Sequence, residues 1–188
     1  PTSTLFCICD ASMIHFLGDD HEVIHLQVSG KGSPIIMLHG WTASHREWSP
    51  FIDQLTPHHR VFRWDARGHG GHRLTQETVP TVQRMAQDLR NLIEYYHLDD
   101  LVAVGHSMGA LTLWQYIKEH GCEKLRKVCF LDQSPKLLTD SEWCDGIYGD
   151  FDQDRSATFL SHLQTDFTES VLQLGAMGLN ASAREKYH

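Results

Sequence analysis

The residues of this chain best suited to chemistry are a serine and two glycines spaced around it, in the run Gly105-His106-Ser107-Met108-Gly109. A serine hydroxyl held exposed on a tight turn attacks a carbonyl carbon once a base has removed its proton. The pattern G-x-S-x-G is typical of such a turn, the nucleophile elbow, where a side chain at either glycine would crowd the backbone. Ser107 is therefore predicted to be a catalytic nucleophile. The alternative is an ordinary strand-to-helix turn with a capping serine.

A nucleophile elbow requires a strand before the serine and a helix after it. The short apolar run 101–104 is typical of a strand, and residues 110–118 are predicted to form a helix that stops at Gly121. Both flanks thus favour the catalytic interpretation of Ser107.

The rest of the chain alternates strands and helices. Residues 34–38 are apolar throughout, as in a parallel strand buried on both faces, and residues 79–97 carry one apolar helical face. Further strands are predicted at 5–9, 23–28, 60–64 and 127–132, and a further helix at 46–55. This order predicts an α/β fold, a mostly parallel sheet with helices on both faces. After Asp132 the pattern changes: 133–154 show no period, and 157–174 and 183–187 look helical with no further strand.

Composition excludes several classes of function. The 188 residues carry a net charge of -8, which disfavours nucleic acid or an anionic membrane as a partner. No run approaches the ~20 apolar residues that cross a bilayer, and the amino terminus lacks the features of a secretory signal. The five cysteines show neither a disulfide framework nor metal-ligand spacing, so we expect reduced thiols, no metal, no cofactor and a cytoplasmic protein. The cysteines are Cys7, Cys9, Cys122, Cys129 and Cys144.

Three other motifs accompany the elbow in a fixed order. They are Leu38-His39-Gly40-Trp41, Asp65-Ala66-Arg67-Gly68-His69-Gly70 and Leu131-Asp132-Gln133-Ser134-Pro135. With the elbow, they make residues 22–135 resemble the α/β-hydrolase family, in its serine esterase and haloperoxidase-like branch. The resemblance implies a hydrolase core over 1–135 and the start of a helical cap region over 136–188.

The resemblance also implies an oxyanion hole. The backbone N–H groups of Met108 and Trp41 would form it, in a loop that includes His39 and Gly40, and the loss of one such donor typically costs ~3 kcal/mol of transition-state stabilisation. Neither His39 nor His106 is expected to be the base: His106 should point away from Ser107, and His39 should hold its loop by hydrogen bonding. The motif residues Asp65 and Arg67 are expected to brace the turn that follows their strand.

In this family the catalytic triad runs in the order Ser, Asp or Glu, His. Most relatives place the acid after the seventh strand and some after the sixth, where Asp132 stands; the alternative is that Asp132 caps its loop. None of His120, His162 and His188 has the context of the base. We therefore expect the chain to be the front portion of a longer protein. On this interpretation the chain lacks the C-terminal strands and stops in or near the cap. The sixth strand would then be an open edge suited to self-association.

The function that follows is hydrolysis of a small apolar ester, thioester or lactone through an acyl-enzyme. Two family alternatives remain. One is oxygen chemistry, either by a cofactor-free dioxygenase acting on a heterocycle or by a perhydrolase-type haloperoxidase. The pattern that resembles the dioxygenases consists of Gly40-Trp41, His45-Arg46 and Asp132. The other is a non-catalytic member that only binds a ligand.

Overall fold

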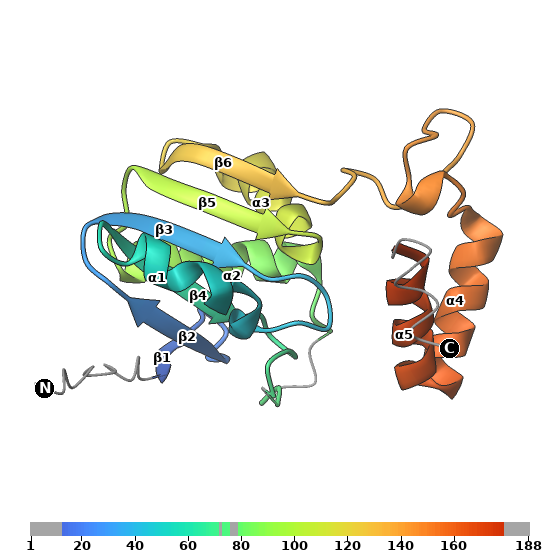
Figure 1. Ribbon diagram of the computed structural model, residues 1–188, viewed down its shortest axis with the longest axis horizontal. Coiled ribbons are helices and arrows are strands. Elements are labelled where there is room, and N and C mark those ends of the chain that lie inside the picture. Colours follow the sequence, from blue (N-terminus) through green and yellow to red (C-terminus); the bar gives the residue numbers. More distant parts are fainter. Residues whose placement is uncertain (1–12, 72, 76–78, 179–188) are drawn as a thin grey trace, which may run out of the picture. The chain divides into compact units, whose positions relative to one another are not determined.

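A computed structural model describes residues 13–71, 73–75 and 79–178 (Figure 1). The chain divides into two compact units, Pro1–Gln133 and Ser134–His188. The strand expected at 5–9 and the helix expected at 183–187 lie outside the described residues. No described helix is both long and apolar enough to span a membrane.

The first unit is built on a six-stranded sheet in the order β1-β2-β4-β3-β5-β6 (Figure 1). The strands β3, β4, β5 and β6 run parallel to one another, and β1 and β2 are antiparallel to their neighbours. The predicted α/β fold with a mostly parallel sheet is confirmed. The strands are β1 (Met13–Leu17), β2 (Val23–Ser29), β3 (Ser33–Leu38), β4 (His59–Asp65), β5 (Leu101–His106) and β6 (Leu125–Leu131).

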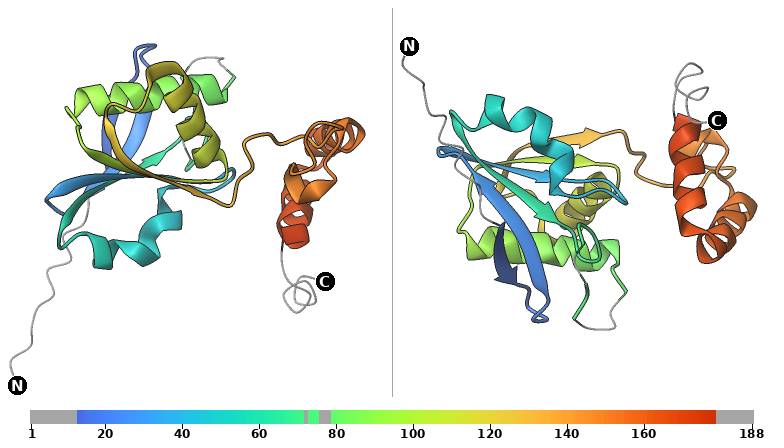
Figure 2. Two further views of the ribbon diagram at one scale, coloured as in Figure 1. Left: turned by 90° about the horizontal axis from the view of Figure 1, so that it is seen from above. Right: turned by 60° about the horizontal axis from the view of Figure 1, so that its bottom comes forward.

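Helices cover both faces of this sheet (Figure 2). The helices α2 (Val82–Tyr95) and α3 (Met108–His120) pack on one face, and a 3₁₀ helix (His45–Phe51) with the short α1 (Ile52–Leu55) lies on the other. Alternate residues of each strand point to opposite faces, so the side chains of the apolar strands contribute to two separate cores. Ile36 and Leu38 belong to the larger core, and Ile35 and Met37 to the smaller one around Trp48.

Two predicted helix boundaries are wrong. The helix expected at 46–55 is a 3₁₀ helix followed by one α-turn, because Pro50 lacks the N–H and the space that a continuous α-helix requires. The helix expected at 79–97 begins only after Thr81, whose hydroxyl accepts a hydrogen bond from the Arg84 N–H. Val79 consequently lies outside the helix with 77% of its surface exposed, although the sequence pattern placed it in the core.

The strand β6 stands at the edge of the sheet and exposes part of its apolar surface, while Leu125 and Val128 are partly buried against the larger core. Phe130 and Leu131 are both exposed, and Cys129 is a free thiol at the surface, as are Cys122 and Cys144. This is the open edge that the sequence predicted, and self-association through it stays a prediction.

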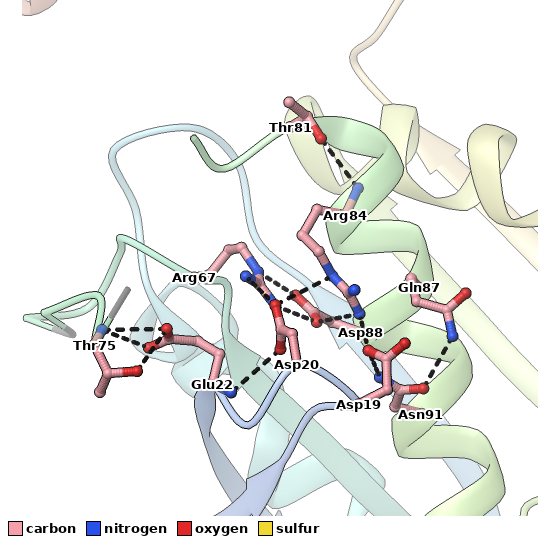
Figure 3. Close-up of polar contacts among 10 residues, drawn as sticks. All are labelled: Asp19, Asp20, Glu22, Arg67, Thr75, Thr81, Arg84, Gln87, Asp88 and Asn91. Atoms are coloured by element: carbon pink, nitrogen blue, oxygen red, sulfur yellow. Dashed lines mark hydrogen bonds and ion pairs between the residues drawn. The ribbon is translucent and has the colours of Figure 1, made fainter. Parts of the chain in front are cut away.

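Buried charges fix the loop that follows β4 (Figure 3). Arg67 is fully buried and donates two hydrogen bonds to Asp88 of α2 and two to Asp20. Burial alone would lower the pKa of Arg67, but these carboxylates outweigh it and raise that pKa. On the same side of the sheet the buried Glu22 accepts hydrogen bonds from the N–H and hydroxyl of Thr75. Arg67 braces this loop, as expected.

The second unit contains a short 3₁₀ helix (Ile147–Gly149), α4 (Gln153–Thr165) and α5 (Phe167–Gly178). The sequence predicted one continuous helix over 157–174, and this is wrong because Asp166 is extended, with φ of -146°. Its carboxylate accepts a hydrogen bond from the Glu169 N–H at 2.9 Å and so starts a new helix. The assignment of this unit to a cap region stays a prediction.

Candidate active site

Ser107 occupies a strained turn between β5 and α3. Its φ of 48° and ψ of -114° are unusual for a residue with a side chain. The turn is held by its backbone: the Ser107 N–H donates to the Leu131 carbonyl at 3.0 Å, and the Ser107 carbonyl accepts from Ala110 at 2.9 Å. The Ser107 side chain makes no capping hydrogen bond to α3, so the alternative of a capping serine does not hold. The hydroxyl is left available for other chemistry.

Both glycines of the motif are required by close backbone contacts. A Cβ on Gly105 would lie 2.5 Å from the Gly109 carbonyl oxygen, and a Cβ on Gly109 would lie 2.2 Å from the Leu38 carbonyl oxygen. No side chain fits at these distances. The G-x-S-x-G pattern is therefore the consequence of α3 starting directly against β3 and β5.

The loop after β3 lies against the Ser107 turn. A Cβ on Gly40 would be 2.9 Å from His106 Nδ1 and 3.4 Å from Ser107 Cβ. The next residue, Trp41, is partly buried and packs against the larger core. The structure thus brings together four of the residues singled out in the sequence, Gly40, Trp41, Ser107 and Met108, at the carboxyl ends of neighbouring parallel strands.

His39 is a buried support for this loop. Its Nε2 lies 3.0 Å from the Ala66 N–H, which donates to it, so Nδ1 carries the ring proton and donates to the Gly40 carbonyl oxygen at 2.7 Å. Burial lowers the pKa of His39, against a smaller opposing effect of the Gly40 carbonyl. With both nitrogens engaged, His39 holds the backbone of Gly40 and does not exchange protons with Ser107.

His106 contacts a carboxylate that the sequence did not single out. Its Nδ1 lies 2.5 Å from Oε1 of Glu47, on the 3₁₀ helix. The ring of His106 is thus paired with Glu47, whereas the base of Ser107 would have to contact the Ser107 hydroxyl. The hydrogen bond with Glu47 raises the pKa of His106, although partial burial opposes it. Burial would raise the pKa of Glu47, but hydrogen bonds from His106 and from the Gly40 N–H hold it below the usual value. No local motif marks Glu47; only the tertiary contact identifies it.

Asp132 and Gln133 follow β6 at the same end of the sheet. His106 is paired in register with Leu131, so the residues that follow them, Ser107 and Asp132, lie at the same level of the sheet. Asp132 is exposed and has a φ of 49°, which ends the strand. Gln133, which the sequence did not single out, accepts a hydrogen bond from Ser107 Oγ at Oε1, with a distance of 3.2 Å.

Within the described residues, no group of three or more histidine, cysteine, aspartate or glutamate side chains is arranged to bind a metal ion. The polar groups beside the Ser107 turn are the Gln133 amide, which accepts the hydrogen bond of the hydroxyl, and the His106 imidazole with its partner Glu47. A serine hydroxyl presented on such a turn can attack a carbonyl group once a base takes its proton.

Comparison with known proteins agrees with this geometry. The family model described as alpha/beta hydrolase fold matches residues 33–183. The chain belongs to the alpha/beta hydrolase fold family. The family assignment rests on most of the chain and includes the Ser107 turn, the Gly40 loop and the end of β6.

Individual relatives carry different activities in their names. The chain is 30% identical over 114 residues to a non-heme chloroperoxidase of Kitasatospora aureofaciens, covering 60% of this chain and 41% of that protein. It is 28% identical over 165 residues to a pimeloyl-[acyl-carrier protein] methyl ester esterase of Vibrio vulnificus, covering 86% and 60%. An esterase structure from Exiguobacterium antarcticum superposes with a TM-score of 0.80 at 20% identity, covering 94% of this chain and 66% of that one. The chain thus spans about half the length of the curated relatives that it matches.

Proposed function

We propose that this protein is a serine hydrolase that cleaves a small apolar ester, thioester or lactone, with Ser107 as the nucleophile. The observation that carries the proposal is the strained backbone of Ser107. In this conformation the hydroxyl does not cap α3, and the side chain lies between the Gly40 loop and the end of β6. Backbone strain of this kind persists where the surrounding structure enforces it, and it gathers at reactive sites.

In the proposed reaction, Ser107 Oγ bonds to the substrate carbonyl carbon as its proton passes to a base. The negative charge of the tetrahedral intermediate is received by the N–H groups of Met108 and Trp41. Met108 is the first residue of α3, where the helix dipole adds positive potential. The intermediate collapses by expelling the protonated alcohol or thiol, and water then releases the acid from the acylated serine.

The position of Trp41 in this mechanism is supported by the bond between His39 and Gly40. The carbonyl of Gly40 and the N–H of Trp41 belong to one trans peptide and therefore point in opposite directions. His39 Nδ1 binds that carbonyl at 2.7 Å and so fixes the direction of the Trp41 N–H. We therefore assign His39 a positioning function.

Asp132 is proposed as the triad acid that orients the base. The support for this proposal is its place directly after β6, at the level of Ser107 and at the carboxyl end of the sheet. In the part of the chain that the structure describes, no hydrogen bond joins Ser107 Oγ to a histidine, since its partner is Gln133. The base is thus proposed to be a histidine other than His39 and His106.

Labelling with a fluorophosphonate tests this function in the native protein that carries the sequence. The reagent should modify one residue, Ser107, identified by mass spectrometry of the labelled peptide, and Ser107→Ala should abolish both the label and ester turnover. A folded native protein that hydrolyses esters equally well after Ser107→Ala would refute the proposal.

A second candidate is peracid formation, favoured by the identity to the chloroperoxidase. Here hydrogen peroxide replaces water in attacking the acylated serine, so the acyl group leaves as a peracid and the serine is restored. Bromination of a diketone that requires peroxide, a carboxylic acid and Ser107 would support it. Oxygen consumption with a heterocyclic substrate, independent of Ser107, would instead support the cofactor-free dioxygenase.

A further inference from the structure

One carboxylate joins the two halves of the proposed site. Glu47 Oε2 accepts a hydrogen bond from the Gly40 N–H at 2.9 Å, and Glu47 Oε1 lies 2.5 Å from His106 Nδ1. Gly40 belongs to the loop after β3, and His106 is the residue before the proposed nucleophile. The 3₁₀ helix that carries Glu47 is thereby linked to both.

Three hydrogen bonds hold the two ends of Gly40. Glu47 binds its N–H, and His39 Nδ1 and the Ala43 N–H bind its carbonyl, at 2.7 and 3.2 Å. The peptide that follows, which carries the Trp41 N–H, can turn only if its carbonyl leaves His39 Nδ1 and the Ala43 N–H, and the Glu47 bond holds the peptide before it. Gly40 also lies too close to His106 for a side chain, so the Glu47 bridge links a loop and a turn that are in direct contact.

Charge makes the bridge stronger than an ordinary hydrogen bond. The pKa of Glu47 is lowered against the effect of burial by His106 and by the Gly40 N–H, and the pKa of His106 is raised by Glu47. The other charged or titratable groups that act on the pair are Asp132 and His39. The side chains of Glu47 and His106 are 23% and 36% exposed, so water screens the pair only in part.

We propose that Glu47 is a positioning residue, which holds the Gly40–Trp41 peptide at a fixed distance from Ser107 so that its N–H faces the developing oxyanion. This inference rests on the proposed function for its catalytic consequence, but the bridge itself can be tested independently. A misplacement of about 1 Å can cost on the order of 100-fold in rate, because oxyanion stabilisation depends on preorganised geometry.

The first experiment tests the bridge by nuclear magnetic resonance on the native protein and on Glu47→Gln. Glutamine keeps the size of the side chain and removes its charge. We expect the titration midpoint of His106 to move down and hydrogen exchange of the Gly40 amide to accelerate on the order of tenfold, equivalent to ~1.4 kcal/mol. Asp53→Asn is the matched control, because Asp53 is an exposed carboxylate on the adjacent α1 and its loss should change neither signal. Unchanged His106 and Gly40 signals in folded Glu47→Gln would overturn the inference.

The second experiment tests the catalytic consequence by the rate of fluorophosphonate labelling of Ser107 across the pH range. Glu47→Gln should slow labelling on the order of tenfold and change the shape of the pH profile. In a separate assay with an ester substrate, the same variant should lower kcat more than it changes KM. Glu47→Asp, which keeps the charge, should recover part of the rate. Asp53→Asn should behave as the native protein.

The outcomes separate the two proposals. A native protein that is never labelled at Ser107 refutes the proposed function, whereas the resonance measurements still decide whether the bridge exists. Labelling of native protein and Glu47→Gln at equal rates refutes the positioning role of Glu47 while the proposed function stands.

Discussion

The hydroxyl of Ser107 donates its hydrogen bond to Oε1 of Gln133, over 3.2 Å. An amide oxygen can accept this hydrogen bond but does not take the proton at neutral pH, because the amide is not a base in that range. The contact orients the hydroxyl at the end of β6 without activating it. Activation requires a base that replaces or joins this contact.

A polypeptide of these 188 residues should therefore turn over p-nitrophenyl acetate poorly. The serine hydroxyl is a weak nucleophile without an adjacent base, and its partner among the described residues is Gln133. We expect its rate to stay close to that of Ser107→Ala, because no described histidine is hydrogen-bonded to Ser107 Oγ. Steady-state assays on the polypeptide, with Ser107→Ala as the blank, check this. Robust turnover by the 188-residue polypeptide that depends on Ser107 would show that a base is already present.

Gly109→Ala should damage the site through its backbone. The added Cβ would lie 2.2 Å from the Leu38 carbonyl oxygen, so α3 must shift away from β3 and carry Met108 with it. We expect a loss of about 1–3 kcal/mol in the free energy of unfolding, typical of overpacking, together with loss of ester turnover. Urea denaturation and kcat measure the two effects. Gly175→Ala is the control, since a Cβ there meets only open space and should leave both unchanged or slightly improve stability.

Asp88→Ala should destabilise the first unit strongly. Arg67 Nε and Nη2 donate to Asp88 at 2.7 and 2.6 Å, and Arg67 is fully buried. Removal of Asp88 leaves the buried guanidinium with Asp20 as its remaining carboxylate partner, so the loss should approach the ~3–5 kcal/mol of a broken buried pair without exceeding it. Chemical denaturation measures the loss, and Glu94→Ala provides the comparison on the same helix. The exposed pair of Glu94 with Arg90 is screened by water, so its loss should change stability little.

The fold of this chain is largely readable from its sequence because its signals are local. The apolar run of β3, the one-sided apolar face of α2 and the spacing of Gly105 and Gly109 around Ser107 each follow from a short stretch of residues. Two of the predicted helices were wrong because a single residue interrupts each of them. Pro50 prevents a continuous α-helix before β4, and Asp166 separates α4 from α5.

The site was only partly readable because its remaining contacts depend on the sheet register. Glu47 meets His106, and Gln133 meets Ser107, across large separations in sequence. Neither pair has a spacing or motif of its own. They come together because β3, β5 and β6 end at the same edge of the sheet, and the 3₁₀ helix follows the first of them.

The pair formed by Glu47 and His106 predicts how stability depends on pH. The pKa of His106 is raised, so its contribution is complete below the ordinary value of 6.5 and is lost as the pH rises through the raised pKa. The pKa of Glu47 is lowered, so its contribution is complete above 4.5 and is lost as the pH falls through the lowered pKa. The pair therefore stabilises most between pH 4.5 and 6.5.

Glu47→Gln should accordingly lower the free energy of unfolding most within that window. Both side chains are partly exposed, so we expect a difference of about 1 kcal/mol or less. Urea denaturation below, within and above the window checks this, with Asp53→Asn as the control that should show no such dependence. A difference between Glu47→Gln and native protein that is constant with pH would contradict the ionic pairing.

Asp132→Asn tests the proposed acid of the triad. Asp132 follows the residue that pairs with His106, and its φ of 49° ends β6 beside Ser107. If its carboxylate orients the base and stabilises the cation formed during attack, the amide should lower kcat of the native protein roughly 10²-fold or more, with a smaller change in KM. Asparagine also tolerates a positive φ, so the turn itself should persist and the free energy of unfolding should change little. Near-normal turnover in Asp132→Asn would leave Asp132 as the residue that caps the loop after β6, and would move the search for the acid elsewhere in the chain.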